Sequence, residues 1–213
     1  NNYGSNKIGN GKELLIEHTS INPNASPHIG RSRNSIIGDF LVRLYKFEGY
    51  NVEANYFIND IGKQISMLLV GVEKLGNIET ITFSDMLKLY IEINDISKTD
   101  KEVEEKIFYY LHELENGNEE VRDKFKKITD ICVEGQQEIF KKMDIKWDRF
   151  THESDFVFEN KTTEILEQLK EKGKLHEDEN GRLYVDLSGY DIPTKSPVLV
   201  LTREDKTSLY PLR

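Results

Sequence analysis

The sequence is short of cysteine and of positive charge, and it contains no long apolar run. A single cysteine, Cys132, excludes an internal disulfide and a cysteine-rich zinc site. No segment reaches the roughly 18 apolar residues that a membrane-spanning helix needs, and the first residues lack the basic and then apolar pattern of a signal peptide. We therefore expect a cytoplasmic protein that does not associate with a membrane.

The charge balance limits the surfaces that the chain can offer to a nucleic acid. A formal net charge of -9 argues against a broad nucleic-acid-binding face, because such faces need clustered positive charge. Any such contact must then be local or lie outside these 213 residues. A hydrophobic share of 37% with 31% charged residues is typical of a globular protein with one core.

The most informative pattern is a strand, a turn and a helix over residues 14–50. Leu14–Ile16 is apolar and predicts a buried strand. Beyond a polar turn, apolar residues at helical spacing predict an amphipathic helix with one face toward the core, and Gly49 predicts its end. These apolar residues are Ile36, Ile37, Phe40, Leu41 and Leu44. In βαβ folds, ligands bind outside the carboxyl ends of the strands, so the turn is the candidate binding site.

The residues of this turn suit an anionic ligand. Pro27 restricts the backbone just before the helix, where free N–H groups and the helix dipole favour phosphate. His28 adds a hydrogen-bond donor, and Gly30 leaves room for a flat group such as a purine. Arg31 and Arg33 add positive charge. His28 could instead be a loop histidine that bonds only to local backbone, but its place at a strand-to-helix turn favours a catalytic role.

The next part of the chain predicts one more strand and then helices. Residues 51–58 predict a second, parallel strand, and residues 62–75 predict a helix. The highly charged segment of about 78–145 predicts an inserted layer of three helices. Ser84 and Asn118 are the expected N-caps of the first and third of them.

The last third of the chain predicts a mixture of short elements. They are an extended segment over 147–158, a helix capped by Asn160, a hairpin over 174–187, a strand over 197–201 and a last strand through Leu209 and Tyr210. We expect residues 1–12 to be a polar linker and residues 13–213 to form the domain, with an α/β connective insertion at about 155–200.

Several segments carry a resemblance to a known family. Pro27–Gly30 after a strand, with Arg33–Asp39 behind it, resembles the nucleotide-binding signature of class I aminoacyl-tRNA synthetases. The segments that narrow the resemblance to arginyl-tRNA synthetases are Glu17, Ser20, Asn22, Asn55–Gln64 and Leu201–Arg213. The likeness covers nearly the whole chain. It implies an α/β fold with a Rossmann-like parallel sheet of the HIGH superfamily, a helical insertion and a small insertion with a β-hairpin.

The resemblance implies a two-step reaction. Such enzymes join L-arginine to ATP as arginyl-adenylate and then transfer the arginyl group to tRNA(Arg). Mg²⁺ enters with ATP as substrate, and no prosthetic group or protein-bound metal is implied. The resemblance assigns catalysis to His28, Gly30 and Arg31. It places the same three residues and Pro27 in the ATP site. We expect a monomer.

The resemblance also implies an arginine pocket. Its members in this chain are Glu17, Ser20, Asn22, Arg31 and Tyr210. Glu17 would pair with the substrate guanidinium, since that group stays protonated and needs carboxylates in its plane. The family's second guanidinium carboxylate falls one residue beyond Arg213. We therefore expect these residues to be part of a catalytic domain and to be inactive alone.

Two departures from the family pattern bear on the chemistry. Arg31 stands where the family usually has a second histidine, and it is bulkier and permanently charged. Ala25 stands where some members carry a lysine that replaces a downstream lysine loop. We therefore expect a lysine loop of the standard type beyond Arg213.

Structural interpretations compete with these functional ones. Glu17 could be a buried acid paired with Arg31 or Arg33. Asn22 and Asn24 could both be turn residues, and for Asn24 this is the preferred interpretation, whereas Tyr56 is best interpreted as a core aromatic. Tyr210 could also be core, and Cys132 is expected to pack inside a helical face. Asp60 matches the family but could simply brace the turn after the second strand. The remaining histidines, His18, His112, His152 and His176, have no metal-like spacing and are expected to be ordinary surface or core residues.

Two other functions stay open. One is a non-catalytic synthetase-like module that binds tRNA, a protein partner or a small ligand. The other is a small nucleotidyltransferase with the same signature, which the run Asn55–Gln64 does not suit.

Overall fold

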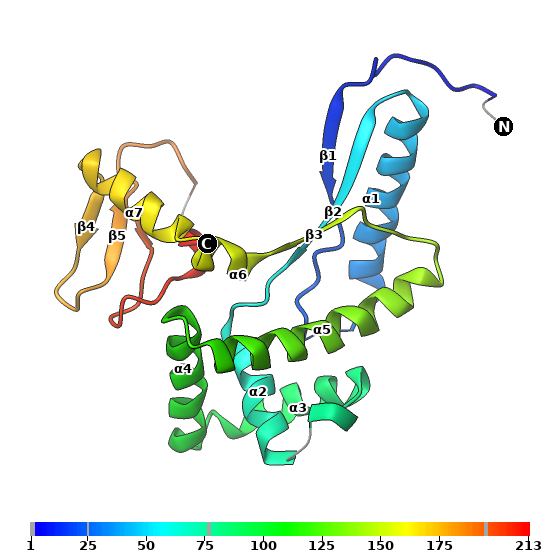
Figure 1. Ribbon diagram of the computed structural model, residues 1–213. Coiled ribbons are helices and arrows are strands. Elements are labelled where there is room, and N and C mark those ends of the chain that lie inside the picture. The colour runs from blue at the N-terminus through cyan, green and yellow to red at the C-terminus, as the bar shows by residue number, and fades with distance from the viewer. Residues whose placement is uncertain (1–2, 25, 76–77, 194–195) are drawn as a thin grey trace.

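A three-stranded parallel sheet and one long helix form the first part of the structure. The computed structural model describes residues 3–24, 26–75, 78–193 and 196–213 (Figure 1). Strands β1 (Glu13–Glu17) and β2 (Asn51–Ile58) are joined by helix α1 (Ile29–Phe47), and β3 (Arg149–His152) completes the sheet order β1-β2-β3. All the pairings are parallel, as a helical crossover requires. The predicted second strand is confirmed at its full length.

Helix α1 packs with a different face from the predicted one. Its buried residues are Ser35, Gly38 and Val42, whereas Ile36, Ile37, Phe40 and Leu44 are 37–60% exposed. Small residues allow the close approach, since a Cβ on Gly38 would lie 2.1 Å from Cβ of His18. The apolar periodicity was therefore a wrong guide to the sheet-facing side of this helix.

Strand β1 is also less buried than its composition predicts. It is an edge strand of the described sheet, and Leu15 is 59% exposed while Leu14 and Ile16 are half-buried against the Val42, Val52 cluster. The prediction of a buried strand is wrong because only the face with Leu14 and Ile16 is packed, whereas Leu15 lies on the opposite, exposed face. The segment predicted as a linker contacts this region: the N–H groups of Gly9 and Gly11 donate to the carbonyls after α1.

A helical layer holds the largest core. It consists of α2 (Lys63–Leu75), the 3-10 turn η1 (Ile78–Thr80), α3 (Phe83–Ile96), α4 (Lys101–Glu115) and α5 (Glu119–Lys141). Helix α2 packs against α3, α4 and α5, and eight consecutive residues of α2 are buried. Cys132 is fully buried here, and burial raises the pKa of its thiol to about 12, so the packing interpretation is confirmed.

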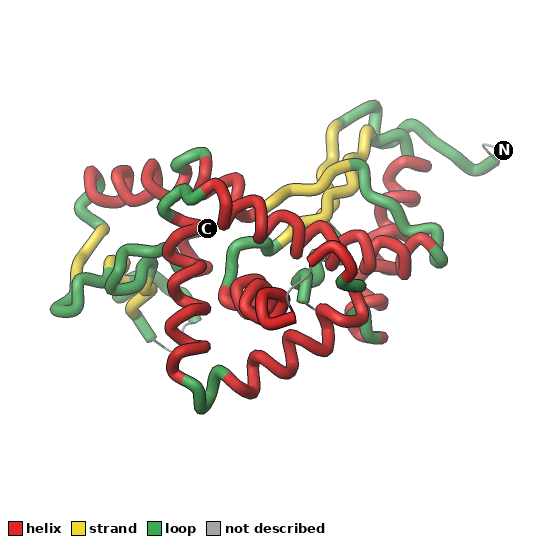
Figure 2. Tube along the Cα trace, turned by 60° about the horizontal axis from the view of Figure 1, so that its bottom comes forward, coloured by secondary structure: helices red, strands yellow, loops and turns green. Residues whose placement is uncertain are grey.

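The caps of these helices follow local chemistry. Asn118 caps α5 as predicted, its side chain accepting from the N–H of Val121. The cap of α3 is Thr82 and not Ser84, because Thr82 and Asp85 form a reciprocal capping box two residues earlier. Figure 2 shows these helices gathered between and below two sheets that lie at opposite ends of the molecule.

The second insertion contains the other sheet. After α6 (Glu153–Phe158) and α7 (Lys161–Glu171), strands β4 (Leu175–Glu177), β5 (Leu183–Asp186) and β6 (Val198–Val200) pair antiparallel in that order. The predicted hairpin and the strand after it are confirmed. The α/β fold, with a parallel sheet, helices and a hairpin-containing insertion, is confirmed as well.

Three local predictions for this last part are wrong. Only Arg149–His152 of the extended segment is a strand, and Glu153–Phe158 is helical. Asn160 precedes α7 with a left-handed φ of 59° and makes no side-chain cap. Tyr210 lies in the 3-10 turn η2 (Tyr210–Leu212), because Pro211 has no N–H for a strand ladder.

Candidate active site

The carboxyl end of β1 holds a carboxylate in a defined orientation. The Ser20 hydroxyl donates to Oε1 of Glu17 at 2.8 Å and accepts from the N–H of Phe57 at 3.1 Å. Glu17 is exposed and forms no ion pair with Arg31 or Arg33 in the described part of the chain. The interpretation of Glu17 as a buried structural acid is therefore wrong.

The turn that carries Ser20 has an unusual backbone. Thr19 and Ser20 have φ values of 74° and 40°, in the left-handed region that residues other than glycine rarely adopt. Next to them His18 is 3% exposed, packs against Gly38 and Trp147, and bonds through Nδ1 to the Thr19 hydroxyl at 3.0 Å. Burial lowers the pKa of His18, partly offset by Asp39, so its imidazole is neutral. The local packing therefore stabilises the strained turn.

The next residues of the turn are held by a buried polar pair. The Tyr56 hydroxyl donates to Oε1 of Gln136 at 2.7 Å and accepts from the N–H of Ile21, and Gln136 donates to the carbonyl of Asn22 at 3.0 Å. Tyr56 is fully buried, so its assignment to the core is confirmed, and burial raises its pKa. The side chain of Asn22 makes no hydrogen bond with the described residues, so its amide is available to a ligand. Asn24 lies in the turn, as predicted.

The second half of the motif caps helix α1. His28 is the N-cap, and its Nδ1 accepts from the N–H of Gly30 at 3.2 Å. A Cβ on Gly30 would lie 3.2 Å from Cε1 of His28, so the glycine leaves space for the imidazole. Arg31 donates to the carbonyl of Ser26 at 3.3 Å, and the first turn of α1 contains no acidic residue. The helix N-terminus is therefore electropositive and exposed.

The structure brings four predicted residues into two bonded pairs and leaves a fifth apart. Glu17 pairs with Ser20 and His28 with Gly30, and these pairs lie at the two ends of one loop. Tyr210 is 70% exposed in η2 and forms no hydrogen bond with either pair in the described part of the chain. Its exposure excludes the core interpretation. Ala25 lies outside the described residues.

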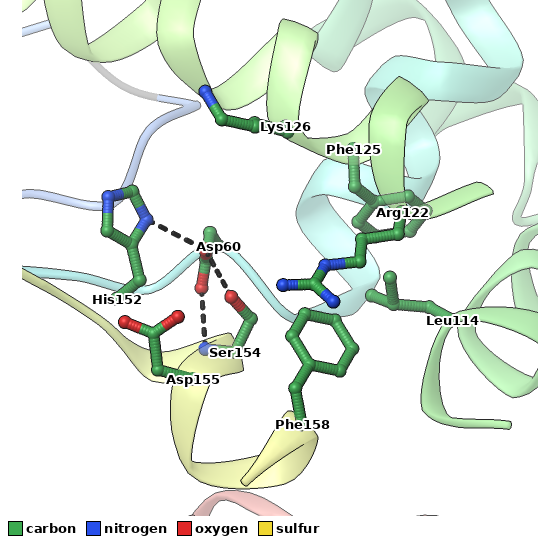
Figure 3. A pocket seen from close by; sticks show the side chains of 9 residues that line it. All are labelled: Asp60, Leu114, Arg122, Phe125, Lys126, His152, Ser154, Asp155 and Phe158. Atoms are coloured by element: carbon green, nitrogen blue, oxygen red, sulfur yellow. Dashed lines mark hydrogen bonds and ion pairs between the residues drawn. The ribbon is translucent and has the colours of Figure 1, made fainter. Parts of the chain in front are cut away.

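A cavity near this edge of the sheet lies beside another carboxylate. It has a volume of 130 Å³ and is lined by Asp60 after β2, by His152 at the end of β3 and by side chains of α4, α5 and α6 (Figure 3). Neither Glu17 nor His28 lines it. Asp60 accepts from the N–H and hydroxyl of Ser154 at 2.8 and 2.7 Å, and its Oδ2 lies 2.9 Å from Nδ1 of His152. The hydrogen bond with Asp60 raises the pKa of His152. The bracing role of Asp60 is confirmed.

Sequence reasoning missed this contact and the buried charges beside it. Asp60 and His152 are 92 residues apart, and no local pattern joins them. Asp60 follows β2 and His152 is the last residue of β3, and this common position at the carboxyl ends of neighbouring parallel strands was the available signal. Among the described residues no cluster of three or more His, Cys, Asp or Glu side chains could hold a metal ion. None of the described helices combines the length and apolarity that crossing a bilayer requires.

Comparisons with known proteins identify the family of the chain. Residues 1–213 match the family described as tRNA synthetases class I (R), catalytic domain. The chain is 37% identical over 217 residues to a protein of Methanothermobacter thermautotrophicus named arginine–tRNA ligase, covering 99% of this chain and 37% of that protein. It is 38% identical to the Methanopyrus kandleri protein of the same name, with coverages of 99% and 37%. The chain thus spans little more than a third of these relatives.

Solved structures show the same arrangement. The arginyl-tRNA synthetase of Thermus thermophilus superposes with a TM-score of 0.68 at 25% identity, covering 94% of this chain and 34% of that one. The Plasmodium falciparum arginyl-tRNA synthetase, at 20% identity, shares the fold with a TM-score of 0.72 over 95% of this chain and 33% of its own. With a family match over its whole length, this chain belongs to the class I tRNA synthetases, in the catalytic-domain family of the arginine type.

Proposed function

We propose that the chain supplies the nucleotide-binding part of an arginine–tRNA ligase. The enzyme would activate L-arginine with ATP and transfer the arginyl group to tRNA(Arg). One observation carries the proposal: a single loop joins an oriented carboxylate, Glu17, to an imidazole at a helix N-terminus, His28, in a chain that matches the family from end to end.

The ATP site would lie at the start of α1. The reaction needs charge stabilisation at the α-phosphate while the arginine carboxylate attacks it and pyrophosphate leaves. His28 can donate from Nε2 to that phosphate, because Nδ1 is already an acceptor for the Gly30 N–H. Arg31 and the free N–H groups of the first turn add positive potential. Pro27 and Gly30 shape the backbone where adenine would lie, and Mg²⁺ would enter as part of the ATP substrate.

The arginine site would lie at the end of β1. Glu17 would accept from the substrate guanidinium, and the free amide of Asn22 would contact the amino acid's polar groups. Ser20 contributes by holding Glu17, because its hydroxyl hydrogen is already donated to that carboxylate. Arg31 would attract the substrate carboxylate. Tyr210 would line the pocket from the far end of the chain.

The contact with tRNA would be local, because a net charge of -9 leaves no broad basic face. We further propose that the enzyme is a cytoplasmic monomer. Sedimentation at several protein concentrations tests the oligomeric state, and a constant mass above that of one chain would contradict it.

Arginine-dependent ATP–pyrophosphate exchange tests the function. The assay uses the complete polypeptide that contains these residues, with and without tRNA, against all standard amino acids. We expect exchange with arginine only, enhanced by tRNA, and its loss in His28→Ala. Exchange with another amino acid would reject the assignment. Tight tRNA binding without any exchange would favour the non-catalytic module.

A further inference from the structure

A buried ion pair fastens the segment that carries Tyr210 to the parallel sheet. Nε of Arg213 lies 3.1 Å from Oε1 of Glu153, and the side chains are 7% and 1% exposed. Arg213 also donates through Nη1 to the carbonyl of Ile61. Glu153 directly follows β3, and Ile61 lies three residues beyond β2. The guanidinium therefore bridges the carboxyl ends of two strands.

A second carboxylate holds the other end of the same segment. Oε2 of Glu115, at the end of α4, accepts from the N–H of Ser208 at 2.6 Å and from its hydroxyl at 2.9 Å. Arg203 lies 4.0 Å from Glu115 and donates to the carbonyl of Ser208 at 3.0 Å. Tyr210 lies between the two anchored residues, Ser208 and Arg213, and its own ring is largely free.

The two segments that Arg213 contacts are also hydrogen-bonded to each other. Asp60, adjacent to Ile61, binds Ser154, adjacent to Glu153, through the bonds drawn in Figure 3. The segments after β2 and β3 are therefore tied to each other as well as to Arg213. Glu153 sits among charges from every side: Arg213 attracts it, whereas Asp60 and Glu115 repel it.

The carboxylate of Glu153 is costly to bury. It is 0% exposed, and neither of its oxygens has a hydrogen-bond partner among the described residues, so its attraction to Arg213 is ionic. A buried pair of this kind is weak evidence for stability, since apolar residues could fill the space at less cost. A buried ion pair is better explained as a contact that specifies one arrangement of the segments it joins.

We propose that Glu153 and Arg213 are positioning residues for the arginine pocket, which set the place of Tyr210 relative to Glu17. The inference rests on the proposed function only in taking Tyr210 and Glu17 as parts of that pocket. Neither Glu153 nor Arg213 needs to touch substrate. Loss of the pair would let the segment between Ser208 and Arg213 move, and the pocket would bind arginine less well.

The test measures KM for arginine and for ATP separately in the exchange assay, on the complete polypeptide. Glu153→Gln and Arg213→Met should each raise KM for arginine about tenfold and leave KM for ATP within twofold. Arg213→Lys keeps the positive charge and should raise KM for arginine about threefold. The matched control is Glu73→Gln, which removes a carboxylate that pairs with Lys106 in the helical layer, and it should leave both constants unchanged.

If Glu153 and Arg213 only stabilised the fold, the kinetic constants of the variants would follow a different pattern. The substitutions would lower the fraction of active enzyme, measured by the adenylate burst, with both KM values unchanged, and that result would overturn the proposal. Hydrogen exchange of the peptide over 208–213 serves if a variant loses activity altogether. Faster exchange there in Glu153→Gln but not in Glu73→Gln supports the proposal, and equal protection in both rejects it.

The two proposals fail in distinguishable ways. Wild-type protein without arginine-dependent exchange would reject the proposed function, and the hydrogen-exchange comparison would still decide whether the pair positions Tyr210. Arginine-dependent exchange with a normal KM in Glu153→Gln would reject the positioning role alone.

Discussion

At the residue scale, small groups fix the positions of larger polar side chains. Gly30 makes room for His28, Gly38 makes room for His18, and the Ser20 hydroxyl orients Glu17. Gly30 and Ser20 contribute through the geometry of a neighbour, so their replacement should change function more than stability. Gly38 differs, because a Cβ there would lie 2.1 Å from Cβ of His18 and would disturb the packing of α1.

Gly30→Ala should separate stability from catalysis. The added Cβ would lie 3.2 Å from Cε1 of His28 and displace the imidazole, so we expect kcat to fall about tenfold or more. The free energy of unfolding should stay level or rise by up to about 1 kcal/mol, because alanine favours the helix. The kinetics of ATP–pyrophosphate exchange measure kcat, and urea unfolding measures the free energy of unfolding, both on the complete polypeptide. An unchanged kcat would show that His28 does not need this space.

Ser20→Ala should weaken arginine binding. Without its donor, the Glu17 carboxylate samples other rotamers, and a loss of about 1 kcal/mol corresponds to a KM for arginine about fivefold higher. The control is Ser26→Ala nearby, whose carbonyl contact with Arg31 does not involve the side chain. A KM for ATP that rises as much as that for arginine would contradict the assignment.

At the element scale, helix α1 shows why the spacing of apolar residues does not by itself identify the buried face of a helix. The apolar stripe of this helix lies largely in solvent, while small residues face the sheet. Close packing selects residues by size as well as by polarity, and periodicity reports polarity alone.

A pair of substitutions in α1 tests this difference. Phe40→Ala should change the free energy of unfolding by less than about 0.5 kcal/mol, because the ring is 60% exposed. Val42→Ala should cost about 2 kcal/mol, because Val42 is buried against β2. Urea unfolding of the 213-residue chain measures both. The reverse order would mean that the predicted face is the buried one.

At the scale of the whole molecule, buried charges join parts that are distant in sequence. Arg213 meets Glu153 and Ile61, Glu115 meets Ser208, and Asp60 meets Ser154. These contacts connect the sheet, the helical layer and the second insertion around one edge.

The titratable groups at this edge, Glu153 and His152, should make the free energy of unfolding depend on pH. Burial raises the pKa of Glu153 to about 7, and Asp60 raises that of His152. The folded state thus binds protons more tightly than the unfolded state at both groups, so both favour folding at low pH. The contribution of Glu153 is lost as pH rises through about 7, and that of His152 is lost as pH rises through its own raised pKa. The lowered pKa of His18 acts in the opposite direction.

The comparison that isolates Glu153 is the difference between wild type and Glu153→Gln. Between about pH 5 and pH 8 the melting temperature of wild type should fall relative to that of the variant. Thermal unfolding at constant ionic strength provides the measurement. Parallel curves for the two proteins would show that Glu153 does not titrate in this range.

The local elements could largely be predicted from the sequence. The bounds of β2, the cap of α5 and the hairpin around Gly181 depend on alternation, a capping side chain and a turn residue, all of which act within a few positions. The motif around His28 was also visible, because the strand, the turn and the helix are consecutive.

Only the tertiary structure decided which face of α1 is buried, that Tyr210 lies in a 3-10 turn, and that Arg213 is held by Glu153 across 60 residues of chain. These features depend on which segments meet and how closely. Helix caps and tight turns are determined by neighbours in the chain, whereas burial, long-range hydrogen bonds and long-range ion pairs are determined by neighbours in space. A single sequence specifies the first directly and the second only through folding.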